Sequence, residues 1–220
     1  MNVDRTKLKV QNQEKNLNFK YPFFGPENYF KIQRQIKKAK LILPSMSQLV
    51  SLVYSTFNSE VEHSEEIKQI MEHFLMWGFT GNLYIPNRGI YIQDNPEIKY
   101  GKLLMEESEL VKKLEENDNS VRFVNFGFEV GKMSPLELSK NQYIIGLVGE
   151  EGADKLAEIT GKYKIESYLW AFKKVNETLK RVSGLSLVRS FNCRISLDSN
   201  NEGDDKFRYA IGIQKIGGKI

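Results

Sequence analysis

The chain has few of the residues from which most metal and thiol sites are built. Its 220 residues include one cysteine, Cys193, and two histidines, His63 and His73. A single cysteine excludes an intramolecular disulfide and a multi-cysteine zinc site. The two histidines are ten residues apart, which matches no common spacing of zinc ligands. We therefore expect a core stabilised by side-chain packing, without a metal or cofactor.

Long hydrophobic runs are also missing. A transmembrane helix needs about 18 consecutive apolar residues, and the N-terminal segment lacks the apolar centre of a secretory signal. We therefore expect synthesis in the cytoplasm and no membrane insertion. The hydrophobic content of 40% and the charged content of 27% are typical of a folded globular chain.

Basic residues are concentrated at the beginning of the chain. The net charge is only +4, but residues 1–40 contain ten Lys/Arg against three Asp/Glu, which leaves +7 there. A basic segment of this kind is either a solvated surface or a contact for phosphates or an acidic partner. The small overall charge argues against nucleic acid as the main partner. Residues 31–40 remain the segment that would carry such a contact.

The order of periodic segments predicts an α+β fold. Residues 1–20 are polar without a period, which predicts a flexible arm or a loosely attached strand before a single domain at 21–220. Ser134-Pro135-Leu136-Glu137 is a capping box with proline at the first helical position, so a helix should run to about Lys140. Further helices are predicted at 47–58, from Ser64 to a stop at Gly78, at 106–117 and at 150–161. Strands are predicted at 82–86, 89–93, 120–130, 143–148, 185–188, 193–197 and 208–216.

No set of residues has the spacing of a catalytic or nucleotide site. The glycines of GLVGEEG (146–152) follow a predicted strand, but Glu150 and Glu151 place negative charge where a phosphate would lie. Paired carboxylates are so numerous that no single pair is specific. We therefore expect a protein that is not an enzyme. The acidic loop 198–205 has two open interpretations, a polar turn or a calcium site, and it departs from the EF-hand pattern.

The C-terminal segment resembles a known fold. A tryptophan in SYLWAF (167–172) is followed by RVSGLSLVRSF (181–191), a stretch rich in asparagine and serine, and a final strand RYAIGIQ (208–214). This order resembles the C-terminal half of a C-type lectin fold of the formylglycine-generating-enzyme type. Within that group it resembles the variable proteins of diversity-generating retroelements. The resemblance covers residues 168–216, and Gln214 stands where that group usually has arginine.

The resemblance implies a binding module with short helices and a small antiparallel sheet that the C-terminal strands complete. Its variable, ligand-contacting residues would lie in the turns between Ser186 and Arg208. The candidates are Arg189, Ser190, Phe191, Asn192, Arg194, Ser196, Asp198, Asn200 and Asn201. Asparagine, serine, arginine and aromatic side chains suit an adaptable binding surface, and adenine-directed mutagenesis favours asparagine codons.

Two functions follow from these observations. The first is non-enzymatic recognition of a protein or cell-surface ligand by the C-terminal half. The alternative is a nucleic-acid-associated or virion structural protein that uses the basic segment 31–40.

Overall fold

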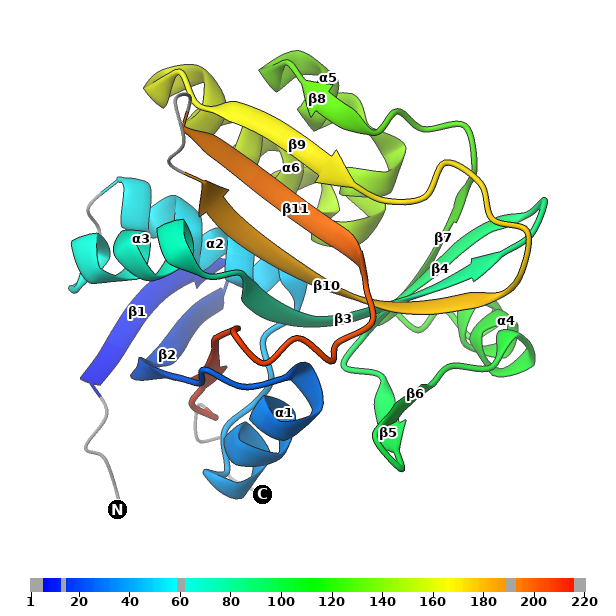
Figure 1. Ribbon diagram of the computed structural model, residues 1–220, viewed down its shortest axis with the longest axis horizontal. Coiled ribbons are helices and arrows are strands. Elements are labelled where there is room, and N and C mark those ends of the chain that lie inside the picture. Colours follow the sequence, from blue (N-terminus) through cyan, green and yellow to red (C-terminus); the bar gives the residue numbers. More distant parts are fainter. Residues whose placement is uncertain (1–5, 13–14, 59–61, 189–192, 216–220) are drawn as a thin grey trace.

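The computed structural model describes residues 6–12, 15–58, 62–188 and 193–215. Its centre is a seven-stranded sheet in which β9, β11 and β10 run side by side (Figure 1). The order is β7 (Val121–Asn125), β4 (Gly89–Asp94), β3 (Met76–Ile85), β10 (Leu179–Val188), β11 (Arg194–Asn201), β9 (Glu166–Trp170) and β8 (Gly131–Met133). Neighbouring strands are antiparallel except β9 and β11, which are parallel. The sheet is larger than the small antiparallel one that the sequence predicted.

A second, three-stranded sheet joins the two ends of the described chain. It contains β1 (Thr6–Asn12), β2 (Lys15–Phe24) and β12 (Ala210–Ile213), in that order. Of the two alternatives for residues 1–20, a flexible arm or a loosely attached strand, the described residues form strands, and the expected boundary at residue 20 falls inside β2. Leu8, Val10 and Phe19 are buried in the main core. Most residues of this segment are polar, so the few apolar residues at every second position were not recognised as a strand pattern.

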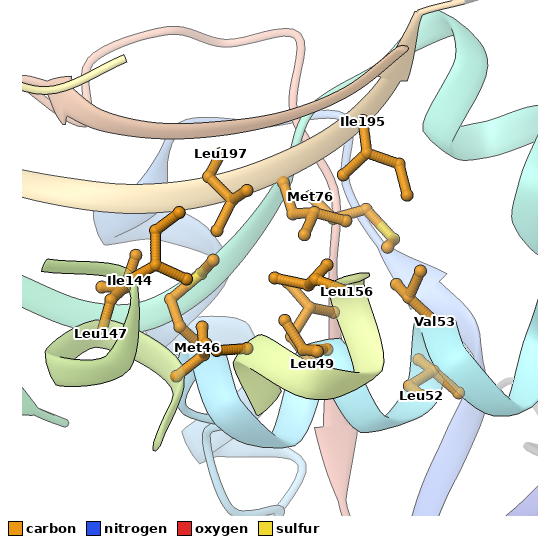
Figure 2. Packing of buried hydrophobic residues seen from close by; sticks show 14 of the residues in the cluster. Met46, Leu49, Leu52, Val53, Met76, Ile144, Leu147, Leu156, Ile195 and Leu197 are labelled. Carbon is orange, nitrogen blue, oxygen red and sulfur yellow. The ribbon is translucent and has the colours of Figure 1, made fainter. Parts of the chain in front are cut away.

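Two helices pack against one face of the large sheet. They are α2 (Met46–Phe57), which Ser45 caps with a capping box, and α6 (Gln142–Tyr163). Figure 2 shows side chains of both helices meeting Ile195 and Leu197 of β11. All of the labelled residues are buried. Because β11 is anchored through every second residue on this side, its other side chains lie on the opposite face of the sheet.

The segment 143–148, predicted as a strand, is the first part of α6. The Asn141 side-chain oxygen accepts hydrogen bonds from the backbone N–H groups of Tyr143 and Ile144, which begins the helix. Residues 142–148 are largely buried against the sheet and α2, so the apolar run that resembled a strand is a buried helix. Gly149, with φ 78° and ψ 166°, interrupts the helix before the predicted helical part begins.

Three of the remaining helices were predicted, with one difference at an end, whereas α1 was not. The remaining helices are α1 (Tyr29–Lys38), α3 (Ser64–His73), α4 (Glu107–Glu115) and α5 (Pro135–Lys140); β5 (Glu97–Lys99) and β6 (Lys102–Leu104) form a separate ribbon. The capping box at Ser134 is confirmed. Gly78 does not end α3 and instead lies within β3. A Cβ atom there would lie 2.3 Å from the Met46 sulfur, so glycine is required by packing.

A buried polar network ties the central strands to α6. The Tyr143 hydroxyl donates to Asn82 Oδ1 (2.9 Å), and the Tyr84 hydroxyl donates to the Ser199 carbonyl oxygen (2.9 Å). Asn82 Nδ2 donates to the Ser183 hydroxyl (2.7 Å). Buried polar side chains that satisfy one another in this way fix one arrangement of the strands that carry them. The network thus holds β3, β10 and β11 in register beneath the candidate site.

Candidate functional site

The candidate site is built on the face of β11 that points away from the helices. Ile195 and Leu197 point into the core (Figure 2). Alternation along the strand therefore places Arg194, Ser196 and Asp198 together on the outer face. These three are among the residues that the sequence predicted as ligand contacts. Their common placement follows from the strand period once the core side is known.

Aromatic side chains of the parallel neighbour β9 extend this face. Tyr168 pairs with Ser196, and Trp170 pairs with Asp198. The two rings lie 4.4 Å apart between centroids, and the Arg194 guanidinium lies 5.2 Å from the centre of the Tyr168 ring. Trp170 is 42% exposed although it is a large hydrophobic residue. An exposed tryptophan next to arginine is typical of protein-binding surfaces.

A polar cavity of about 230 Å³ opens on this outer face. Strands β9, β10 and β11 line one side, and the last turn of α3 with the residues that follow it lines another. Its lining is Met71, Glu72, His73, Phe74, Leu75, Trp170, Ser186, Val188, Arg194, Ser196, Asp198 and Arg208. The sheet thus supplies the predicted residues, whereas the segment 71–75 comes from a distant part of the sequence.

Backbone hydrogen bonds bring Arg208 to the cavity. The Tyr209 N–H donates to the Leu75 carbonyl oxygen (3.2 Å), and the Trp77 N–H donates to the Tyr209 carbonyl oxygen (2.8 Å). Arg208 also forms an ion pair with Asp205 at 2.5 Å. The segment before β12 is therefore held against the beginning of β3, with Arg208 facing the β11 side chains.

Asp198 is the most perturbed acid of the cavity. Burial raises the pKa of its carboxyl above the ordinary value, although the Asn200 N–H donates to it (3.1 Å) and nearby Arg208 favours the charged form. Desolvation outweighs these two stabilising contacts. A carboxyl group in this position is sensitive to any further charge that enters the cavity.

The other predicted contacts have different placements. Asn200 lies near the end of β11, and its N–H group is the donor to Asp198. The Asn201 side-chain oxygen accepts from the Gly203 N–H (2.8 Å) and so shapes the turn that follows the strand. Arg189, Ser190, Phe191 and Asn192 lie outside the described residues.

Sequence reasoning did not identify Tyr168, His73 or Arg208 as site residues, and it used Trp170 only to mark the beginning of the region. The alternation of Tyr168 and Trp170 with buried Ser167 and Leu169 was a usable signal for an exposed aromatic face. No local signal could place residues 71–75 or Arg208, because only the tertiary fold brings them to β11.

The loop 198–205 is organised by its own hydrogen bonds. Asp198 and Asn201 accept from backbone N–H groups two residues ahead, and the Phe207 N–H donates to Asp205 (2.9 Å). Within the described ranges, no group of three or more His, Cys, Asp or Glu side chains is placed to hold a metal ion. These hydrogen bonds give the loop the geometry of a polar turn, one of the two interpretations that the sequence left open.

Most of the basic segment 31–40 forms α1. Its apolar side chains Ile32 and Ile36 are buried, whereas Lys37 and Lys38 lie in its last turn, where the helix dipole stabilises positive charge. This placement gives the lysines a structural role. The nucleic-acid alternative stays a prediction.

A larger groove of about 880 Å³ lies away from the predicted residues. It runs between the segment 123–133 and the beginning of α5 and α6, and it exposes Leu136 to 63%. Its lining includes the apolar residues Phe126, Val130 and Leu136 and the basic residues Lys132 and Lys140. None of the residues that the sequence predicted as contacts lines this groove.

Comparison with known proteins supports the architecture. No family model matches the chain, and no curated protein is similar to it. A solved structure, described as the accommodation of massive sequence variation in Nanoarchaeota by the C-type lectin fold, superposes with a TM-score of 0.58. It is 14% identical, and the match covers 93% of this chain and 100% of that one.

The chain therefore has a C-type lectin fold. The predicted fold class is confirmed, and the similarity to a C-type lectin fold covers 93% of the chain instead of its C-terminal half alone. In the part of the chain that is described, no helix combines the length and the apolar character needed to cross a membrane.

Proposed function

We propose that this chain is a non-enzymatic binding protein that recognises a protein or cell-surface ligand through the outer face of β9, β10 and β11. The observation that carries the proposal is the alternation of core residues and cavity-lining residues along β11. Inward residues Ile195 and Leu197 lie in the core, and outward residues Arg194, Ser196 and Asp198 line a cavity beside Trp170. Binding residues positioned by a rigid scaffold are the usual arrangement of a recognition module.

We further propose that this face is diversified. An outward side chain of β11 can be replaced without changing the helix-packed core, because the strand is anchored from its other side. The described similarity to a fold that accommodates sequence variation supports this idea. In this proposal the chain is a variable protein of a diversity-generating retroelement, with the formylglycine-generating-enzyme variant of the fold.

The genomic locus tests diversification. We expect a reverse-transcriptase gene and a near-copy of the 3′ end of this gene that differs from it at adenines. The codons of the outward residues should be among the differing positions, whereas those of Ile195 and Leu197 should be unchanged. A locus without either element would contradict the retroelement part of the proposal and leave ligand binding open.

Binding to arrayed purified proteins and cell-surface glycans tests recognition. The full chain should bind a small set of targets, and a variant with alanine at Tyr168, Trp170 and Arg194 should lose them. The matched control replaces Lys37, Lys38 and Lys40 of the basic segment by glutamine and should retain binding.

The same experiment separates the two functions. Binding through the outer face should depend weakly on salt. If nucleic acid were the partner, affinity should fall steeply with salt and should be lost in the basic-segment variant instead. That outcome would overturn the proposal in favour of the nucleic-acid alternative.

A further inference from the structure

Three hydrogen-bond donors at the cavity on the outer face have no acceptor among the described residues. They are Nε of Arg194, the hydroxyl of Ser196 and Nε of Arg208. Buried polar atoms without a partner are rare in folded proteins and often mark the place of an absent ligand or water. All three belong to side chains that line one cavity of about 230 Å³. Glu72, which has another interaction, adds one buried acceptor, Oε1, to the same lining.

The chemistry of these atoms restricts what can bind them. An arginine Nε carries one N–H group and can only donate, and the serine hydroxyl can donate as well. The partner must therefore supply hydrogen-bond acceptors. A metal cation or an ammonium group has none, so neither satisfies the two arginines.

Charge selects among the possible acceptors. Within the described part of the chain, Arg194 forms no ion pair. Its guanidinium group makes a cation–π contact with the Tyr168 ring. Arg208 is paired with Asp205. Glu72 also lines the cavity and already has an interaction partner. Arg194 is thus the cavity arginine that forms no ion pair among the described residues, although Asp198 and Glu72 also place carboxyl groups in the lining. Arginine binds a carboxylate through two parallel hydrogen bonds.

We propose that this cavity binds a carboxylate group of the ligand, with Arg194 as its ion-pair partner and Arg208 and Ser196 as further donors. The inference rests on the proposed binding function of the outer face and names the chemistry that it recognises. The unpartnered atoms are enclosed by the lining, so the long arginine side chains rotate to present their N–H groups when the acceptor enters.

Asp198 opposes such a ligand. Its carboxyl group lines the same cavity and would repel a second carboxylate. The proposal therefore predicts opposite effects for two neutralising substitutions on the same strand. Arg194→Gln should weaken carboxylate binding, whereas Asp198→Asn should strengthen it.

The test uses the full chain with succinate and with its neutral isostere succinamide as probes. Titrations followed by the NMR signals of the arginine Nε–H groups should shift Arg194 and Arg208 with succinate and leave them unchanged with succinamide. We expect Arg194→Gln to reduce succinate affinity at least tenfold and Asp198→Asn to raise it several-fold. Arg34→Gln, at an exposed position of α1, is the matched control for loss of one positive charge and should change nothing.

A second pair of probes distinguishes the source of the carboxylate. If the ligand is an acidic protein segment, a short peptide with a central glutamate should bind and shift the arginine Nε–H signals, whereas the same peptide with glutamine should not. Binding of succinate without a difference between the peptides would assign the cavity to a small free carboxylate.

Several results would overturn the inference. They are equal shifts with succinate and succinamide, equal loss of affinity in Arg34→Gln and Arg194→Gln, or weaker binding in Asp198→Asn. Melting temperatures of all variants exclude unfolding as the cause. These results would leave the array experiment intact, because targets lost on removal of Tyr168 and Trp170 would still establish the outer face as the binding surface.

Discussion

Single side chains on β11 have two distinct tasks. Ile195 and Leu197 are fully buried and bind the strand to α2 and α6. Arg194 and Asp198 are only partly buried and face the cavity instead. A substitution in the first set creates a void in the core, whereas one in the second set leaves the core packing intact and changes what the surface can bind.

Asp198 shows that a surface of this kind costs stability. For an acid with a raised pKa, the folded state binds the proton more tightly than the unfolded state. The free energy of unfolding contributed by this group is thus greatest below the ordinary pKa of 3.8 and falls as the pH rises through the raised value. At pH values above the raised pKa, the contribution of this group to the free energy of unfolding no longer changes with pH.

We predict that Asp198→Asn is more stable than the wild type at pH 7. The amide keeps an acceptor for the Asn200 N–H and removes the buried charge. The difference should shrink as the pH falls toward 3.8. Urea denaturation at pH 7 and pH 4 measures it. Exposed Asp204→Asn should stay within about 0.5 kcal/mol of the wild type at both pH values, and a less stable Asp198→Asn at pH 7 would contradict the prediction.

At the scale of elements, α6 is the unit that the sequence pattern misrepresented. Its first part is buried on several sides, so it lacks the polar face by which an amphipathic helix is recognised. Gly149 then changes the direction of the chain with a positive φ of 78°. The bend lets residues 142–148 and the amphipathic second part each contact the core.

The bend leads to a matched pair of predictions within one helix. Gly149→Ala should destabilise the protein by about 1–3 kcal/mol, because its φ and ψ lie in a region that is nearly restricted to glycine. A Cβ atom there meets nothing within 4 Å, so the cost is conformational and not steric.

Gly161→Ala is the control in the same helix. Its Cβ atom would lie 3.8 Å from Pro135, an ordinary contact, and the backbone is helical. Alanine should stabilise this position by about 0.5–1 kcal/mol. Thermal and urea unfolding of both variants measure the contrast. Equal effects at the two glycines would show that the bend is not under conformational constraint.

At the scale of the whole molecule, the two ends of the described chain support each other. Strand β2 pairs with β1 on one side and with β12 on the other, and Phe19 lies opposite Ile213. Both side chains are buried. The three-stranded sheet therefore closes the core beneath the large sheet, and residues 6–12 and 15–20 belong to the domain.

Removal of residues 1–20 should abolish cooperative unfolding. The deletion takes away β1 and half of β2 and exposes the buried residues of β12. Phe19→Ala is the milder variant and should cost about 3–5 kcal/mol. Exposed Lys9→Ala on β1 should cost less than about 0.5 kcal/mol. A truncated chain with an unchanged melting temperature in scanning calorimetry would contradict the role of this sheet.

The sequence by itself determined the features that depend on neighbours along the chain. The capping box at Ser134, the strands on either side of residues 87–88 and the C-terminal strands follow from local periods and turn residues, and the structure contains them. The order of features after Trp170 also indicated the fold. Arg194, Ser196 and Asp198 were predicted on that basis.

Only the tertiary structure decided which surfaces are covered. Burial against β12 made strands of the polar N-terminal residues, and burial against α2 made a helix of 143–148. The cavity is lined by residues 71–75, by β9–β11 and by Arg208. The first and last of these residues are more than a hundred positions apart in the sequence, and they meet because β3, β10 and β11 are adjacent in the sheet. Local sequence carries no signal for such contacts, because their free energy arises from surfaces that approach only in the folded chain.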